Sequence, residues 1–537
     1  MVLRHRPHPV HPFNCFRVLL AALLLAAACP LFAKWAPVDQ AELKDTKPRI
    51  DPEAGAEILL KEVEIRHHDF SDLESTYHLR VKIFSTRGLD DFAKVEIPYD
   101  NDTTIKGIEA RTIKPDGTVI ELDPKEIFDR EVIKTNKTRV KVKSFAPPGL
   151  VVGAIVEYRY RVSSEDETYF LTLSFNSEQP SRLVKFRYSP ITGFAVQVYL
   201  RWMFSNLPKQ NTKLGSDDFY ELSMTNVPAL KEEPLSPPSY NSASSALIYY
   251  SLNKGDAPKD YWPQQRKELA ESETAKLAPS GALKTALATI VAPGDDNTTK
   301  LRKIYDYCRT KITNRDRDTT SFTTAQQKKL KANKTATDIV THGYGNSEDV
   351  NVLFTALARL AGLDAHFAMC NRRDLMLFNS QITEPFMLPD LVTVVYLDGA
   401  ARYFDPGATY LPFGMLAWQN ANTAIMCATT RGDVLVYPDS TPATDSVERR
   451  KAHFTLDEDG TLEGDVTITY SGYCDAEKKY LLDGQTTAER EAYYRDAVKD
   501  NLKQAEVTQI KIEHVTDPLE PMSVSYHLRV PEYGDRT

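Results

Sequence analysis

Residues 343–361 read GYGNSEDVNVLFTALARLA, a glycine-rich turn that leads into a long apolar stretch. From Val350 to Leu360 the apolar side chains recur every three or four residues, which is the spacing of one face of an α-helix. Gly362 follows at once, and glycine readily takes the left-handed conformation found just after many helices. The stretch therefore predicts a buried helix that ends before Gly362.

The start of this helix is polar. Asn346 or Ser347 is expected to cap it, because a side-chain oxygen there accepts a hydrogen bond from a free backbone N–H of the first turn. Glu348 and Asp349 follow, where the positive end of the helix dipole favours acidic side chains. The capping residue could be either of the first two.

Three short strands are expected after the helix. Residues 365–370, 392–397 and 401–404 are rich in apolar side chains, and an Asp-Gly pair supplies a tight turn between the last two. Upstream, apolar residues at helical spacing over 301–312 predict another helix. Helices followed by an antiparallel hairpin indicate an α+β domain.

This order of elements, closed by Asp405-Pro406, resembles the papain-like core of the transglutaminase-like superfamily over residues 285–430. In those enzymes a cysteine nucleophile stands at the start of the buried helix, where the helix dipole stabilises a thiolate. A histidine on the first strand of the hairpin acts as the base, and an aspartate on the second strand orients it.

Carried over position by position, the resemblance places Ser347 where the cysteine stands and Leu391 where the histidine stands. Asp405 occupies the position of the aspartate, and it alone agrees with the superfamily. No histidine lies between His366 and His453. The resemblance therefore implies an enzyme fold whose catalytic cysteine and histidine are lost.

Ser347 has two interpretations. As a nucleophile it would need an adjacent base, and His342 and His366 are the only substitutes, both of which would require unusual geometry. As a helix cap it needs no base. The sequence favours the cap and hence a protein that is not an enzyme. The alternative is a peptidase or acyltransferase that uses Ser347.

Residues 34–230 have the pattern of an antiparallel β-sandwich. Residues 76–84 alternate in polarity, and Pro115-Asp116-Gly117 is typical of a tight turn between strands. Over roughly residues 50–230 the chain resembles the β-rich domain of unknown function that precedes transglutaminase-like domains in many exported bacterial proteins.

Two further segments complete the organisation. Residues 231–284 contain several prolines among Ser, Asn and Lys, and this composition predicts a linker, in which residues 246–251 could add one strand to a neighbouring sheet. Residues 450–537 are expected to form a C-terminal β-domain with a helix near 487–502. The chain ends soon after a strand, so the sequence leaves the completeness of this domain open. The predicted fold class is α+β and multidomain.

The first 33 residues have the layout of a signal peptide. Basic residues precede an apolar run from Val18 to Ala28, and cleavage after Ala33 is expected. Cleavage before Cys29, followed by attachment of lipid to this cysteine, is the alternative. No later segment has the roughly 18 consecutive apolar residues that span a bilayer. The chain is therefore predicted to be exported, to the periplasm or cell envelope.

Composition limits the function further. A net charge of −8 gives no basic surface for nucleic acid. The four cysteines after the signal peptide are widely spaced, so neither a metal site nor another cofactor site is predicted, and buried thiols are favoured. The loss of catalytic residues that the resemblance implies, together with the predicted export, indicates a binding or scaffolding module in the envelope, with a peptide, a protein or an envelope polymer as its partner.

Overall fold

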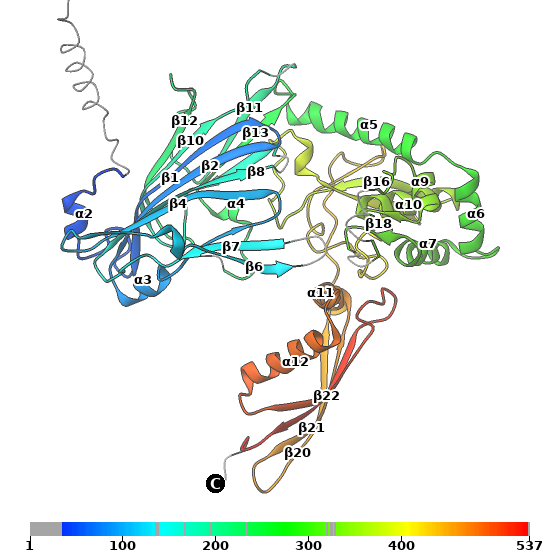
Figure 1. The fold of residues 1–537 in the computed structure, drawn as a ribbon. Helices are drawn as coiled ribbons and strands as arrows, with labels where there is room; N and C mark the ends of the chain where they lie inside the picture. The colour runs from blue at the N-terminus through cyan, green and yellow to red at the C-terminus, as the bar shows by residue number, and fades with distance from the viewer. Residues whose placement is uncertain are drawn as a thin grey trace, which may run out of the picture.

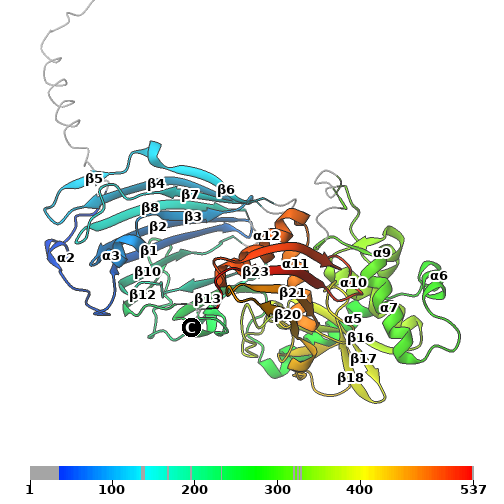
Figure 2. The ribbon, with the colours of Figure 1, turned by 90° about the horizontal axis from the view of Figure 1, so that it is seen from below.

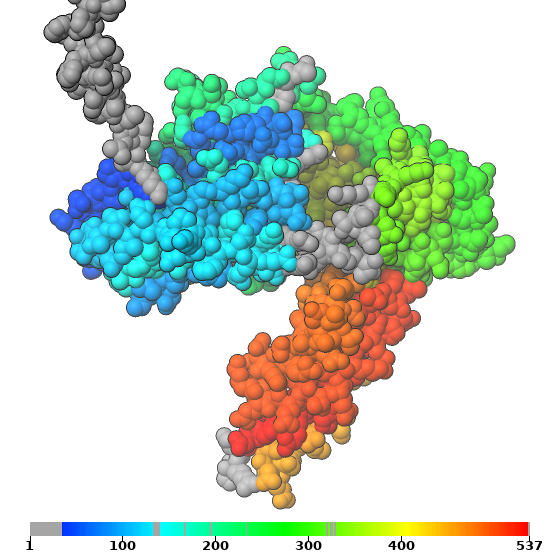
Figure 3. Space-filling model, in the orientation of Figure 1, coloured from blue at the N-terminus to red at the C-terminus, as the bar shows by residue number. Residues whose placement is uncertain are grey.

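The computed structural model describes residues 35–534, apart from residues 135–138, 166–167, 194–195, 232, 318–320, 323–325 and 327–328. The predicted signal peptide, including Cys29, lies outside the described residues. An N-terminal β-domain lies beside a central α+β core, and a C-terminal β-domain projects from the core (Figures 1 and 3). The expected α+β multidomain fold is confirmed. None of the described helices is both long and apolar enough to cross a membrane.

A twisted seven-stranded sheet dominates the N-terminal domain (Figure 2). Neighbouring strands are antiparallel except for β1 and β10, which run parallel. Val184, Phe186 and Tyr188 on β10 are buried at every second position, as expected of a strand with one face against a core. In sheet order the strands are β12 (Tyr220–Val227), β10 (Ser181–Ser189), β1 (Ala56–Asp69), β2 (Asp72–Ile83), β8 (Ile155–Ser164), β4 (Thr103–Ile113) and β5 (Val119–Glu121).

Two three-stranded sheets pack against this large sheet and complete the predicted sandwich. One consists of β11 (Tyr199–Ser205), β13 (Ser245–Ser251) and β9 (Phe170–Ser174), and the other of β3 (Val95–Tyr99), β7 (Arg139–Phe145) and β6 (Phe128–Lys134). Phe186 of the large sheet shares a buried cluster with Leu173 and Ile248 of the first small sheet. The short elements of this domain are α2 (Gln40–Lys44), α3 (Thr86–Asp91) and η1 (Pro124–Glu126).

Residues 231–284 do not form the expected irregular linker. They contain α4 (Ser239–Ser242), the central strand β13 of a small sheet, and the 19-residue helix α5 (Pro258–Lys276). Pro258 occupies the first turn of α5, where a missing N–H removes no helical hydrogen bond. Trp262 of α5 and Tyr249 of β13 are buried with Met387 of the core. Burial of these side chains outweighs the weak local propensity of a proline-rich sequence.

The central core places one buried helix between other helices and a four-stranded sheet. α10 (Ser347–Leu360) is buried from Val350 to Ala358 and contacts α7, β16 and β17. The other helices are α6 (Gly281–Ile290), α7 (Asn297–Lys311) and α9 (Ala336–His342). In sheet order the strands are β18 (Ala400–Phe404), β17 (Asp390–Leu397), β16 (Asp364–Cys370) and β19 (Ile425–Cys427). The short elements of the core are β14 (Thr313–Asn314), β15 (Tyr344–Gly345) and η2 (Pro385–Met387).

The core agrees with the sequence analysis in its main elements. The helix after the glycine-rich turn and the three expected strands are present, within two residues of the predicted bounds. The four described cysteines form no disulfide, and Cys308, Cys370 and Cys427 are buried, whereas Cys474 is partly exposed. The prediction of buried thiols therefore holds for three of these four cysteines.

The C-terminal domain is a four-stranded antiparallel sheet covered on one face by helices. Val466 and Val524 of the sheet share a buried cluster with Tyr494 of α12. Its strands, in sheet order, are β20 (Glu448–Leu456), β21 (Leu462–Tyr470), β23 (Ser523–Val530) and β22 (Glu506–Glu513). Its helices are α11 (Gly472–Leu482) and α12 (Thr487–Asn501), and the short 3-10 helix η3 (Ala443–Asp445) precedes β20. The predicted helix near 487–502 is α12.

Candidate functional site

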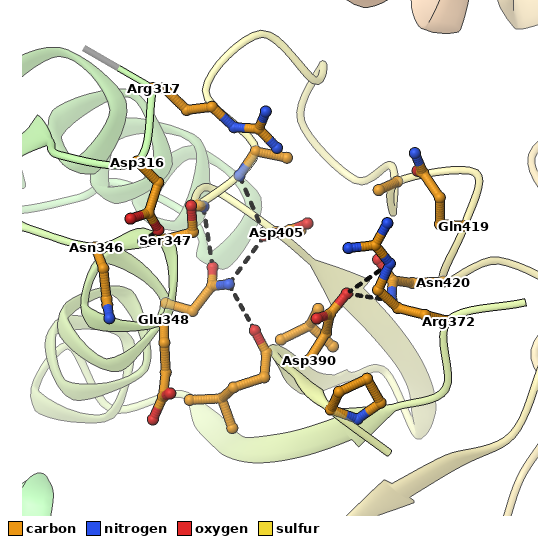
Figure 4. Close-up of a pocket in the computed structure, with 17 residues that line it drawn as sticks. Asp316, Arg317, Asn346, Ser347, Glu348, Arg372, Asp390, Asp405, Gln419 and Asn420 are labelled. Carbon is orange, nitrogen blue, oxygen red and sulfur yellow. Dashed lines mark hydrogen bonds and ion pairs between the residues drawn. The ribbon is translucent and has the colours of Figure 1, made fainter. Parts of the chain in front are cut away.

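The start of α10 forms one wall of a cavity of about 410 Å³ in the core (Figure 4). Asn346 caps the helix: its side-chain oxygen accepts a hydrogen bond from the N–H of Asp349 at 2.7 Å, and the Asp349 carboxylate accepts one from the N–H of Asn346 at 3.1 Å. The expectation that Ser347 serves as the cap is therefore wrong. Because Asn346 fills that role, Ser347 is the first helical residue and lines the cavity.

Two neighbours occupy the polar groups of Ser347. The side-chain amide of Asn314 donates to the Ser347 hydroxyl oxygen at 3.2 Å and to the carbonyl of Gly407 at 2.8 Å. The backbone N–H of Ser347 donates to the Asp316 carboxylate at 2.8 Å. A negatively charged side chain therefore lies at the positive end of the α10 dipole, where it is electrostatically favoured.

Asp405 lies just after β18 and reaches the same cavity. Its carboxylate accepts hydrogen bonds from the side-chain amide of Asn351 at 2.9 Å and from the backbone N–H of Ala408 at 3.2 Å. Burial raises the pKa of Asp405 to about 6, although these two hydrogen bonds act in the opposite direction. The neighbouring Asp390 adds to the upward shift in the pKa.

Asn351 links the three predicted site positions. It lies one helical turn after Ser347, and its amide donates to the carbonyl of Leu391 at 2.7 Å as well as to Asp405. Its side-chain oxygen accepts from the N–H of Gly407 at 3.1 Å. The sequence analysis missed Asn351, although a single amide inside an apolar helix was a signal for a buried polar contact.

Leu391 contributes an apolar side chain to the cavity and is itself buried. The two histidines considered as substitutes have other partners and do not line the cavity. His342 lies 2.7 Å from the side-chain oxygen of Asn333. His366 lies between the carboxylates of Glu273, at 3.2 Å, and Asp364, at 3.0 Å. The structure thus brings Ser347, Leu391 and Asp405 together and leaves both histidines outside.

The remaining walls of the cavity carry charged and amide side chains. Figure 4 shows Arg372, Gln419 and Asn420 on the side opposite Ser347. The amide of Asn420 donates to Asp390 at 2.9 Å, and the Arg372 guanidinium lies 3.9 Å from Asp390. A ligand in this space would meet donors and acceptors on both sides.

No metal site accompanies these residues. Within residues 35–534, gaps excepted, no group of three or more His, Cys, Asp or Glu side chains is arranged to hold a metal ion.

Comparison with known families agrees with the domain order. Residues 71–231 match the Domain of Unknown Function DUF3857, and residues 284–384 match the Transglutaminase-like superfamily. Residues 284–384 are therefore similar to the transglutaminase-like core. Ser347 falls within the second match, whereas Leu391 and Asp405 lie beyond its end.

Three solved structures illustrate how distant the structural likenesses are. A "putative protease" from Parabacteroides distasonis is 14% identical, with a TM-score of 0.47, covering 89% of this chain and 93% of the other. Leukotriene A4 hydrolase from Saccharomyces cerevisiae is 7% identical, with a TM-score of 0.21, covering 44% and 40%. An M1 zinc metallopeptidase from Deinococcus radiodurans is 9% identical, with a TM-score of 0.16, covering 43% and 56%. Likenesses at this level support no inference about function. A comparison with curated proteins gives no match.

Proposed function

We propose that the transglutaminase-like core is catalytically inactive and that its cavity binds a peptide, a protein partner or an envelope polymer. The observation that carries this proposal is the contact between the Ser347 N–H and the Asp316 carboxylate at 2.8 Å. This contact occupies a backbone donor that a nucleophile at the start of α10 would need for acyl transfer.

Acyl transfer by a nucleophile at Ser347 would place a developing oxyanion near the backbone N–H groups at this helix end. Catalysis of this kind depends on donors that are free to bind the oxyanion, and loss of one donor reduces the rate by about 100- to 1000-fold. Here the N–H of Ser347 already donates to a carboxylate. The negative charge of Asp316 would also repel the oxyanion.

Activation of the serine hydroxyl is the second requirement. Serine needs a general base within hydrogen-bond distance, about 2.6–3.2 Å. No histidine among the described residues lines the cavity, and the position that resembles the catalytic histidine is the apolar Leu391. Asp405, which would orient such a base, instead accepts from Asn351. These contacts support loss of both the nucleophile and the base.

The chemistry of the cavity walls supports a binding role. The cavity lies within the volume range of about 300–1000 Å³ that is usual for ligand sites. The amide of Gln419 and the guanidinium of Arg317 face this space and can bond to polar groups of a ligand. The signal peptide predicted from residues 1–33 supports a proposed role in the periplasm or cell envelope.

Covalent labelling tests the inactive state. A fluorophosphonate probe should leave the wild-type protein unlabelled, because no base is placed to remove the Ser347 proton. A Ser347→Cys/Leu391→His variant should become more reactive toward iodoacetamide than Ser347→Cys alone, since the new histidine would lie near Asp405. Saturable labelling of the wild type that disappears in Ser347→Ala would refute the proposal and favour a serine hydrolase.

Calorimetric titration with peptides and purified envelope polymers tests the binding role. Gln419→Ala removes a half-buried amide from the cavity wall, and Gln264→Ala removes an exposed amide on α5 as a matched control. A ligand of the cavity should bind the Gln419→Ala protein several-fold more weakly and the control with unchanged affinity. Equal affinities for the wild type and both variants would place binding elsewhere.

A further inference from the structure

We propose that a second cavity, between the core and the C-terminal domain, binds a small oxyanion of the phosphate type through Lys311 and Arg317. The cavity has a volume of about 480 Å³. The end of α7 and residues 312–317 form its core side, and Asp483, Thr516 and Pro518 form its side in the C-terminal domain. It is distinct from the Ser347 cavity, although Arg317 lines both.

The lining of this cavity carries a net positive charge, whereas the whole chain carries a net negative charge. The chain has 74 acidic and 66 basic residues. The cavity, by contrast, is lined by three cationic side chains, Arg309, Lys311 and Arg317, and by one carboxylate, Asp483. Asp483 already accepts a hydrogen bond from the Tyr410 hydroxyl at 2.9 Å. The lining therefore has an excess of positive charge that attracts an anion.

Arg309 is engaged with protein groups. It donates to the carbonyls of Thr409 at 3.2 Å and Leu411 at 2.9 Å in the core, and to that of Pro518 at 2.8 Å in the C-terminal domain. It also forms an ion pair with Asp306 at 2.9 Å. These contacts hold the two domains together, so Arg309 contributes charge to the cavity but few open donors.

Lys311 and Arg317 form no ion pair with the described residues, although the charge of Arg317 also acts on Asp405 in the first cavity. Neither lies within 4.0 Å of an acidic side chain among the residues for which side chains are described. The guanidinium of Arg317 lies 4.6 Å from the centre of the Tyr480 ring on α11, and this stacking limits its orientation. A guanidinium and an ammonium at one cavity suit the oxygens of a phosphate group, because charge-assisted hydrogen bonds to such oxygens are strong.

The hydroxyl groups of the lining add to this chemistry. Thr313 and Thr516 line opposite sides of the cavity and can donate to an anion. The cavity is larger than a single phosphate ion, so the group could be free phosphate or part of a small phosphomonoester. Free phosphate and a phosphomonoester present the same kind of oxygen to Lys311 and Arg317. The two ligands are therefore tested separately.

Ligand-induced stabilisation tests the proposal. Wild type, Lys311→Ala and Lys300→Ala are titrated with sodium phosphate and, separately, with glycerol 3-phosphate, at an ionic strength held constant with sodium chloride. Lys300→Ala is the matched control, since it removes the same charge from the same helix, outside the cavity. Wild type and Lys300→Ala should gain thermal stability with increasing anion, and Lys311→Ala should bind at least tenfold more weakly.

The two anions distinguish the sources of the phosphate group. Tighter binding of glycerol 3-phosphate than of phosphate would assign the site to phosphomonoesters, and equal or weaker binding would assign it to the free ion. The same titration on Arg317→Lys, which keeps the charge but loses the planar donor pair, should show reduced affinity. Equal responses of Lys311→Ala and wild type, or a response matched by chloride alone, would overturn the proposal.

Discussion

Replacement of Asp405 by asparagine tests whether burial of this carboxyl outweighs the hydrogen bonds and the charge of Arg317, which favour its ionised form. The pKa of Asp405 rises from 3.8 to about 6, chiefly because burial disfavours the charged form. At about 1.4 kcal/mol per pKa unit, a shift of this size corresponds to about 3 kcal/mol. Asparagine keeps an oxygen that can accept from Asn351 and from the N–H of Ala408, and it carries no charge.

The sign of the pH dependence follows from linkage. The folded-state pKa of Asp405 exceeds its unfolded value, so its favourable contribution is fully present below about pH 4 and is lost as the pH rises through about 6. Asp405→Asn should therefore be more stable than the wild type at pH 8, by up to about 3 kcal/mol. The difference should shrink as the pH falls and disappear near pH 4.

Urea unfolding between pH 4 and pH 8 measures this difference. Hydrogen exchange of peptides from α10 reports the unfolding of the core separately from that of the other domains. Asp398→Asn is a suitable control, because it removes an exposed carboxylate in the turn between β17 and β18, outside the cavity. Parallel stability curves for wild type and Asp405→Asn would refute the reasoning. Lower stability of Asp405→Asn at pH 8 would show that a cation compensates the Asp405 charge.

Three further predictions concern the helix cap, the former linker and export. Asn346→Ala should lower the unfolding free energy by about 1 kcal/mol, because Asn346 makes the capping bond. Ser347→Ala should change the unfolding free energy less. The midpoints of urea unfolding measure both effects. Limited proteolysis followed by mass spectrometry should show residues 258–276 resistant to early cleavage, since α5 is packed against the core; early cuts there would contradict its burial. The exported protein should lack residues before about Lys34 by N-terminal mass spectrometry, and a retained Met1 would contradict the predicted signal peptide.

Local periodicity was sufficient to predict α7, α10 and three of the four strands of the core sheet. The helix after the glycine-rich turn and the strands over 365–370, 392–397 and 401–404 have strong apolar patterns, and the structure contains them all. The strand considered at 246–251 is present as β13, but helix α5 was not predicted because it is stabilised by contacts distant in sequence. Trp262, for example, is buried against residues more than a hundred positions later. Propensity and composition do not report such contacts.

The candidate site was predicted in part. Ser347, Leu391 and Asp405 were identified through the family resemblance, and the structure brings them to one cavity. Asp316 was missed because it lies in a loop 31 residues before Ser347, with no periodic pattern to indicate its position. Asn351 was missed because a polar residue in a buried helix has no assignable partner until the chain is folded.

The energetics of Asp405 bear on whether the cavity binds a ligand or is only part of a scaffold. A buried carboxyl whose pKa is raised to about 6 destabilises the folded protein at neutral pH, and a domain with a purely structural role gains nothing from it. Groups of this kind concentrate at functional sites, where a bound partner can supply a further hydrogen bond or a compensating charge. Since the carboxyl lies beside an open space of about 410 Å³, it can interact with such a partner. The raised pKa of Asp405 beside this space therefore supports the proposed ligand-binding role.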